Sequence, residues 1–301
     1  MKQILLVTGY SRGIGAALVE NLRKRNNLFQ FIYLGRRPPA VAICDSGDVF
    51  LQVDLGQELS AAFKSDLLHV LQNLQCADHG PARAQEHAML VATHLGNTPQ
   101  NACAGLLYAA GDLGPLGFSP ADVRHEARAF YVNAINFAAL SRIVLPFLLA
   151  SPIDNFVFHL SSGAALNAYA DLATYASSKA AALMHSRCLA LALKNEERLF
   201  LEANSRQPAG HAVAATSAPA RGVCTRVLSV APGTVATDMT RQLAHSDKEK
   251  YPQLQKFRDL LAQNAYKSTE VAAVELASLL FDAEKASLRK QIDGCHFDLR
   301  S

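Results

Sequence analysis

One stretch decides the fold: Thr8-Gly9-Tyr10-Ser11-Arg12-Gly13-Ile14-Gly15. It follows a short apolar run at residues 2–7, which predicts a buried strand, and it precedes apolar positions spaced four apart, which predict a helix. Glycines in such a turn let the backbone approach a phosphate, and a helix N-terminus offers free N–H groups and partial positive charge. We therefore expect a dinucleotide pyrophosphate site at Gly9, Ser11, Arg12, Gly13, Ile14 and Gly15. An ordinary tight turn is the alternative.

Short apolar runs alternate with helical patterns along the rest of the chain. The predicted strands are 2–7, 29–34, 49–53, 104–110, 156–160 and 223–230, with a last edge strand within 291–297. The predicted helices begin near residue 13 and cover 59–74, 122–149, 173–197 and 268–281. This alternation predicts βαβ units and a parallel sheet covered on both faces. We expect one α/β domain, residues 1–301, with a doubly wound, Rossmann-type sheet.

Two polar stretches, at about 75–103 and 202–221, break this alternation. Long loops without secondary structure are uncommon inside compact domains. We therefore expect both stretches to be surface insertions. A lid over a site, or a contact with a partner, is the alternative.

Composition excludes several classes of protein. Of the 301 residues, 50% are hydrophobic and 18% charged, which excludes a disordered chain, and a net charge of +3 indicates neither nucleic-acid nor membrane-surface binding. The six cysteines are scattered without zinc-ligand spacing, so we expect no metal site and a cytoplasmic location. The most apolar stretch, 143–150, is too short for a membrane span. The N-terminal apolar run meets a glycine and Arg12 at once, which argues against a signal peptide.

The end of the second predicted strand indicates which dinucleotide binds. Proteins that bind NAD place a carboxylate there for the ribose 2′-hydroxyl. This chain has Arg36 and Arg37 instead, and arginine pairs with a 2′-phosphate. Arg12, in the glycine turn, is a further candidate for that phosphate. We therefore expect NADP(H) as cofactor; a solvated basic turn is the alternative.

A second motif lies after the fifth predicted strand. Ser162 precedes Tyr175 by thirteen residues, and Lys179 follows the tyrosine by four, which places Tyr175 and Lys179 on one helix face. A neighbouring ammonium lowers the pKa of a phenol, which is otherwise about 10. Together with the Gly-x-x-x-Gly-x-Gly turn, this pattern resembles the short-chain dehydrogenase/reductase family. The resemblance implies that Tyr175 is the general acid in carbonyl reduction, that Lys179 holds the nicotinamide ribose, and that Ser162 hydrogen-bonds the substrate carbonyl.

The same resemblance assigns further residues. Asn133 matches the asparagine that supports a water relay to the lysine; a buried asparagine satisfied by other partners is the alternative. Asp54 and Leu55 match the adenine contact. The segment Pro232, Gly233, Val235 and Thr237 matches the contact with the nicotinamide carboxamide. The family's Asn-Asn-Ala-Gly is here Tyr108-Ala109-Ala110-Gly111, in which Ala109, Ala110 and Gly111 still permit passage of the cofactor. The loss of the asparagines puts contacts that stabilise the strand in doubt.

Within the family the chain most resembles the sepiapterin reductases and the related benzil-type dicarbonyl reductases. The resemblance lies in residues 53–56, in Asp238-Met239 and in the tail, 293–298, where Asp298 matches the acid that anchors the pterin. A carboxylate accepts two hydrogen bonds from a pterin edge, so Ser162, Tyr175 and Asp298 are the expected substrate residues. A solvated Asp298 near a fraying terminus is the alternative. Tyr169, Leu166 and Met239 are candidate pocket walls.

The expected function is NADPH-dependent reduction of the side-chain ketones of a pterin, a step of tetrahydrobiopterin biosynthesis. A broad dicarbonyl reductase on a small-molecule carbonyl substrate is one alternative. A protein that binds NADP(H) without chemistry is another, which an intact Tyr175 and Lys179 disfavour. The resemblance also implies a homodimer through the helices after strands four and five. Its candidate faces, which core packing explains equally well, are Phe130, Phe137, Leu140, Ala180, Leu183 and Leu189.

Overall fold

A computed structural model describes residues 2–25, 28–39, 47–75, 102–118, 123–205 and 223–300. These residues form one seven-stranded sheet in the order β3-β2-β1-β4-β5-β6-β7, with every neighbouring pair parallel. The strands are β1 (Gln3–Thr8), β2 (Phe29–Gly35), β3 (Val49–Gln52), β4 (Ala102–Tyr108), β5 (Asn155–Leu160), β6 (Thr225–Ala231) and β7 (His296–Asp298). The predicted parallel, Rossmann-type sheet is confirmed.

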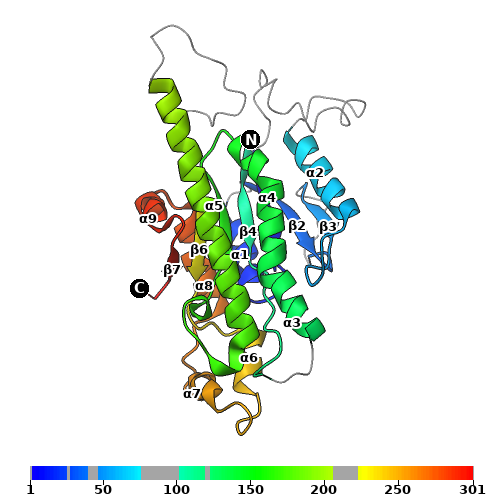
Figure 1. Cartoon of the computed structure of the whole chain (residues 1–301), viewed down its shortest axis with the longest axis vertical. Coiled ribbons are helices and arrows are strands. Elements are labelled where there is room, and N and C mark those ends of the chain that lie inside the picture. The colour runs from blue at the N-terminus through cyan, green and yellow to red at the C-terminus, as the bar shows by residue number, and fades with distance from the viewer. Residues whose placement is uncertain are drawn as a thin grey trace.

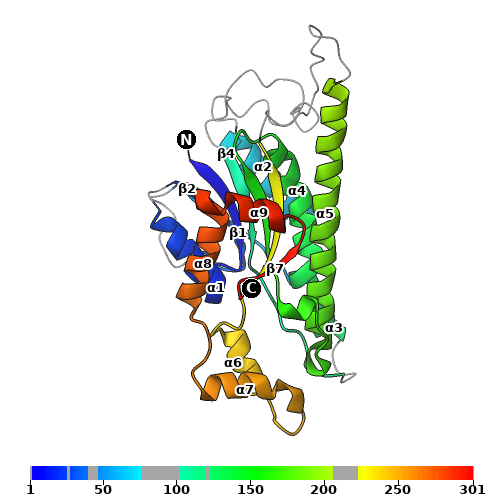
Figure 2. The ribbon, with the colours of Figure 1, turned by 90° about the vertical axis from the view of Figure 1, so that its left-hand side faces the viewer.

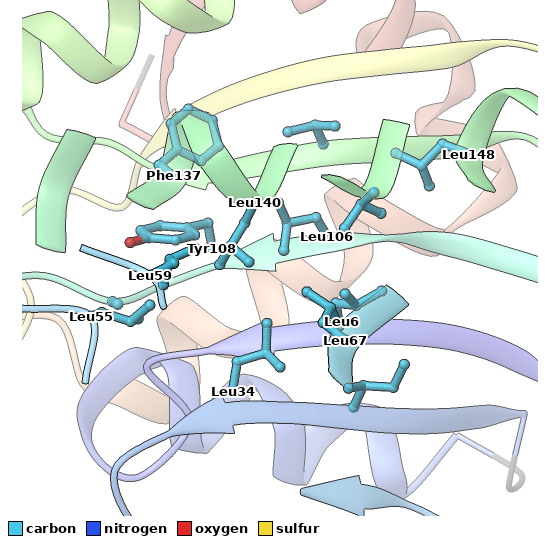
Figure 3. Close-up of a cluster of buried hydrophobic side chains, with 14 of the residues drawn as sticks. Leu6, Leu34, Leu55, Leu59, Leu67, Leu106, Tyr108, Phe137, Leu140 and Leu148 are labelled. Atoms are coloured by element: carbon cyan, nitrogen blue, oxygen red, sulfur yellow. The ribbon is translucent and has the colours of Figure 1, made fainter. Parts of the chain in front are cut away.

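Helices cover both faces of the sheet (Figures 1 and 2). One face carries α1 (Gly13–Arg23), α8 (Thr269–Phe281) and α9 (Ala286–Ile292); the other carries α2 (Ala61–Gln75), α4 (Asn136–Leu149) and α5 (Ala173–Ser205). Successive strand residues point to opposite faces, so Leu6 packs with Leu106 and Phe137 while Leu5 packs under α1 and α8. Figure 3 shows the first of these cores. Both faces of the sheet are buried under helices, which explains why the strands are continuous apolar runs.

The helix predicted at 122–149 consists of three segments in the structure. It comprises α3 (Val123–Phe130), a π-helical segment (Tyr131–Ile135) and α4, which runs past Pro146 to Leu149. By length and composition, residues 123–149 could cross a membrane, although the sequence indicated no segment of that length; no second such helix occurs among the described residues. Phe137, Leu140 and Val144 are fully buried against the sheet. We therefore assign this segment to the core.

The structure corrects several boundaries. β4 begins at Ala102, inside the predicted insertion, because Ala102 and Cys103 are buried and pair with β1. α5 continues to Ser205, past the start of the second predicted insertion. The rest of the two predicted insertions, 76–101 and 206–221, lies outside the described residues. In the tail, 291 and 292 end α9, and the edge strand is only the three residues of β7.

Two helices that the sequence analysis missed lie beyond the carboxyl edge of the sheet. They are α6 (Asp238–Ala244) and α7 (Gln255–Ala262) (Figure 2). Their patterns are short, and α7 has no fully buried residue, so no long apolar stripe marks them. Met239 on α6, Phe257 on α7 and Tyr251 between the two helices belong to a small apolar cluster with Tyr169 and Tyr175.

Candidate active site

A cavity of about 830 Å³ opens at the carboxyl edge of the sheet, where ligands of open α/β sheets bind. Its volume is within the usual range for cofactor and ligand pockets. Ser162, Tyr175 and Lys179 line it together with all the predicted cofactor residues: Gly9, Ser11, Arg12, Gly13, Ile14, Gly15, Arg36, Arg37, Asp54, Leu55, Ala109, Ala110, Gly111, Pro232, Gly233, Val235 and Thr237. Asn133, Asp298 and the candidate wall Leu166 are not among the lining residues.

The glycine turn is packed too tightly for side chains. Gly9 has φ +71°, and a Cβ there would lie 2.4 Å from the backbone carbon of Ala109. A Cβ on Gly15 would lie 2.2 Å from the carbonyl oxygen of Gly9. The turn therefore draws α1 close to β4, and no side chain caps the helix N-terminus. The first N–H groups of α1 are thus available to a phosphate, and the turn fits a dinucleotide.

The basic residues at the far end of the cavity are exposed. Arg36 and Arg37 follow β2 directly, and the hydroxyl of Tyr10 donates a hydrogen bond to the carbonyl of Arg37. Arg12 forms an exposed ion pair with Asp238 at 3.6 Å, which is worth little in water. These guanidinium groups fit a 2′-phosphate.

Asp54 has a partner that the sequence did not reveal. Burial alone would raise the pKa of its carboxyl. Hydrogen bonds from the Gly56 amide and from Arg128 lower the pKa by more than burial raises it, so the net shift is downward. Arg128 lies 3.2 Å from one Asp54 oxygen and 3.3 Å from the other, and it also contacts Asp112 at 3.3 Å. Arg128 lines the cavity, yet it lies on α3, 74 residues from Asp54, so no local motif marks it.

The predicted catalytic side chains meet on one wall. Ser162 follows β5 and caps a short 3₁₀ turn, while Tyr175 and Lys179 project from the first turns of α5. The Lys179 Nζ atom lies 5.9 Å from the Tyr175 ring centre and donates a 2.8 Å hydrogen bond to the carbonyl of Leu160. Among the described residues, therefore, the lysine donates its hydrogen bond to a backbone oxygen and not to the phenol.

The structure corrects the expected pKa of the tyrosine. Burial raises the pKa of Tyr175 above 10, and a hydrogen bond with Ser162 lowers it only in part. The expectation that Lys179 makes the phenol more acidic is wrong for this geometry. Burial also lowers the pKa of Lys179 to about 7. Tyr175 therefore holds its proton at neutral pH, which is the state that a proton donor needs.

Burial of Lys179 predicts a dependence of stability on pH. Because its pKa falls from 10.5 to about 7, the unfolded chain holds a proton between these values that the folded chain has released. The free energy of unfolding therefore rises with pH across this window, and the increment is lost as pH falls towards 7. Relative to Lys179→Met, the wild type is expected to gain about 3 kcal/mol between about pH 7 and about pH 9.5. Urea unfolding measures this, and parallel pH profiles of the two proteins would refute it.

Asn133 does not point into the cavity. It is fully buried in the π-helical segment, where its amide donates to the Asp112 carbonyl (2.7 Å) and to the Ser178 hydroxyl (2.8 Å) and accepts from the Asp112 amide (2.9 Å). Its side chain joins the loop after β4 to α5. Asn133 is therefore a buried asparagine whose polar atoms are hydrogen-bonded within the protein, which was the alternative interpretation. A water relay through this side chain has no geometric support here.

The departure at Tyr108 leaves the end of β4 well held. The Tyr108 hydroxyl donates to the carbonyl of Val132 at 2.6 Å, so the strand is tied to the π-helical segment. The Thr8 hydroxyl accepts the Ala110 amide at 3.3 Å. These bonds supply the contacts that the loss of two asparagines put in doubt.

Asp298 forms an ion pair instead of facing the cavity. Both of its carboxylate oxygens contact Arg300, and the side-chain hydrogen bond from Arg300 lowers the pKa of the Asp298 carboxyl. Arg300, in contrast, lines the cavity. β7 is also joined to the catalytic loop, since the Nε2 atom of His296 lies 3.1 Å from the carbonyl oxygen of Ser162. The structure thus places the tail beside the site, but with an arginine where the sequence predicted an acid.

Comparison with known proteins gives the same assignment of fold. The chain matches no family model. A short-chain dehydrogenase/reductase from Saccharomyces cerevisiae superposes with a TM-score of 0.66 at 22% identity, covering 99% of this chain and 96% of the other. The fold is that of the short-chain dehydrogenases/reductases.

Three further likenesses are to a reductase of known sequence and to two solved oxidoreductase structures. The (S)-benzoin-forming benzil reductase of Saccharomyces cerevisiae is 26% identical over 299 residues, covering 97% of this chain and 95% of the relative. Among solved structures, a 4-hydroxyisoleucine dehydrogenase complexed with NADH and the NADPH-dependent reductase YwfH of bacilysin biosynthesis each have a TM-score of 0.62, at 17% and 14% identity. They cover 99% of this chain, and this chain covers 96% and 97% of theirs. Fold neighbours thus use both nicotinamide cofactors.

Proposed function

We propose that this chain is an NADPH-dependent reductase of 1,2-dicarbonyl compounds. The observation that carries the proposal is the shared cavity, whose lining includes the glycine turn at one end and Ser162, Tyr175 and Lys179 at the other. A tyrosine and a lysine that were paired only by chance on the surface of a helix would not line the same cavity as the glycine turn. The likeness to benzil reductase supports a carbonyl substrate.

The residues fit the chemistry of carbonyl reduction. A bound reduced nicotinamide supplies the hydride that forms the new C–H bond. The Ser162 hydroxyl donates a hydrogen bond to the carbonyl oxygen as negative charge develops there. Tyr175, which is protonated at neutral pH, gives its proton to that oxygen and completes the alcohol. Lys179 has a pKa of about 7 and can return a proton to the phenolate.

A dicarbonyl substrate is favoured over a pterin. The pterin assignment depended on a free carboxylate at Asp298, which is instead occupied by Arg300 and does not line the cavity. Around Tyr175, the substrate end is apolar, with Tyr169, Met239 and Phe257 in its wall. Such a wall suits an aryl or alkyl ketone.

Turnover measurements test this proposal. With NADPH and saturating 1-phenyl-1,2-propanedione or benzil, we expect NADPH absorbance to fall, and we expect a lower kcat/KM with sepiapterin. A preference for sepiapterin would restore the pterin assignment. No turnover with any of the three would favour the non-catalytic, NADP(H)-binding alternative.

The choice of NADPH rests on Arg36 and Arg37, since the described segment that follows β2, residues 36–39, contains no acidic residue that could accept a hydrogen bond from a ribose hydroxyl. Replacing both with Ser is expected to raise the KM for NADPH by about 100-fold or more and to leave the KM for NADH within about threefold, because each charged hydrogen bond to phosphate is worth about 1.5–3 kcal/mol. Steady-state kinetics with both cofactors measure this. Equal effects on the two would contradict the assignment of the 2′-phosphate.

We also propose a homodimer, through exposed positions other than those first expected. Phe137, Leu140 and Leu183 are buried in the core and cannot form an interface. Ile135, Met184 and Leu191 are instead 46%, 55% and 61% exposed on the π-helical segment and α5. Light scattering is expected to give the dimer mass, and Met184→Glu with Leu191→Glu the monomer mass. A wild-type monomer at micromolar concentration would refute this.

A further inference from the structure

Arg300 is placed at the substrate end of the cavity by the edge of the sheet. β7 pairs with β6 so that Asp298 lies beside Ala231, and the Leu299 amide donates to the Ala231 carbonyl at 2.9 Å. The next residue, Arg300, therefore crosses the turn that follows β6. A Cβ added to Gly233 would lie 3.1 Å from the Arg300 Cδ atom, so the aliphatic part of the arginine lies on the glycine.

Asp298 fixes the direction of this guanidinium. The Nε atom of Arg300 donates to Oδ1 at 2.8 Å, Nη2 donates to Oδ2, and the Arg300 amide donates to Oδ1 at 3.0 Å. This side-on fork uses two of the five guanidinium N–H groups. Within the described residues, no acceptor is found for the outer edge, formed by Nη1 and the second N–H of Nη2. That edge is a second planar fork with room for one more oxygen acceptor.

The surroundings of this fork indicate a substrate group and not a protein partner. Arg300, Tyr169, Met239 and Phe257 line the same cavity as Ser162 and Tyr175. Lys256 also lines the cavity, whereas Asp238, an acidic residue of the lining, is paired with Arg12 and Arg241. A donor fork beside the apolar side chains of Tyr169, Met239 and Phe257 selects a molecule that is largely apolar and carries an oxygen acceptor.

We propose that Arg300, held by Asp298, is a specificity-determining residue that binds the second oxygen of the substrate, next to the carbonyl that Ser162 and Tyr175 reduce. This inference rests on the proposed reductase function and deepens it. The fork makes 1,2-dicarbonyl compounds better substrates than simple ketones of the same shape. Asp298 acts through the arginine as a positioning residue.

A matched pair of substrates isolates this contact. 1-Phenyl-1,2-propanedione and propiophenone differ only by the carbonyl oxygen beside the reacting group. For each enzyme, the measured quantity is the ratio of kcat/KM for the diketone to kcat/KM for the monoketone. The intrinsic reactivity of the diketone cancels when the ratios of variant and wild type are compared.

Three variants are compared with the wild type. In Arg300→Met with Asp298→Asn, the arginine is removed without leaving a lone carboxylate, and the ratio is expected to fall by about 10- to 100-fold, the value of one charged hydrogen bond. Arg300→Lys keeps the positive charge but loses the planar fork of donors. In this variant the ratio is expected to fall by most of the amount expected for the double variant. Arg241→Met removes an arginine at the same end of the molecule, outside the cavity lining, and the ratio is expected to stay within about twofold.

The outcomes separate this inference from the proposed function. A wild type that reduces neither ketone would overturn both. A wild type that reduces the diketone, with an unchanged ratio in the double variant, would overturn the role of Arg300 alone. An equal fall of the ratio in Arg241→Met would attribute the effect to net charge and would also overturn it. Retained melting temperatures and NADPH binding show that each variant is folded.

Discussion

Replacing Tyr175 with Phe is expected to lower kcat for the diketone by about 10²- to 10⁴-fold, the usual contribution of a positioned acid. The ring is part of the apolar cluster with Tyr169 and Met239, and phenylalanine keeps that packing. The variant loses only the hydroxyl, which is hydrogen-bonded to Ser162 and is the proposed proton donor. Steady-state kinetics with NADPH measure this effect.

The matched control is Tyr131→Phe, on the π-helical segment outside the cavity lining. It removes the same atom from the same residue type, and kcat is expected to stay within about twofold. NADPH binding, followed by its fluorescence, is expected to survive in both variants. A Tyr175→Phe enzyme with wild-type kcat would show that the proton comes from elsewhere and that the wall of Ser162, Tyr175 and Lys179 is not catalytic.

Replacing Gly9 with Ala is expected to abolish NADPH binding and to lower the melting temperature. The positive φ alone costs a residue with a side chain about 1–3 kcal/mol. The added Cβ would in addition lie 2.4 Å from the Ala109 backbone, so α1 or β4 must shift. Either shift changes the turn that is proposed to hold the pyrophosphate. Fluorescence titration with NADPH and thermal unfolding measure the two effects.

Gly163→Ala is the control for this substitution. A Cβ at Gly163 meets nothing within 4 Å, and the residue has no positive φ, so we expect a melting temperature close to that of the wild type. If Gly9→Ala bound NADPH with the wild-type Kd and melted like Gly163→Ala, the glycine turn could not be the phosphate cradle.

The fold was predictable because its determinants are local. Each central strand is an apolar run, since both faces of the sheet are dry, and the turn after β1 carries glycines where φ or close packing requires them. The placement of Ser162, Tyr175 and Lys179 in one cavity was also predictable, because their spacing puts Ser162 just after β5 and the other two on one face of α5.

The rest of the site depends on contacts between residues distant in sequence. Arg128 meets Asp54 only when α3 packs near the end of β3, and no spacing marks that pair. Arg300 forms an ion pair with the Asp298 carboxylate, two residues away in the sequence. This contact affects the site only because β7 pairs with β6, which brings Arg300 to the cavity. The pKa of Tyr175 was predicted in the wrong direction because sequence spacing reveals a neighbouring charge but not burial, and burial has the larger effect here.

Transfer of an isotope from the cofactor tests the central claim most directly. The protein is incubated with 1-phenyl-1,2-propanedione and NADPH that carries deuterium at C4 of the nicotinamide, with each of the two C4 isotopomers in turn. The account predicts that one isotopomer alone yields a hydroxyketone with one deuterium on the new carbinol carbon, seen by mass spectrometry. A hydroxyketone without deuterium from either isotopomer, or no hydroxyketone at all, would contradict it.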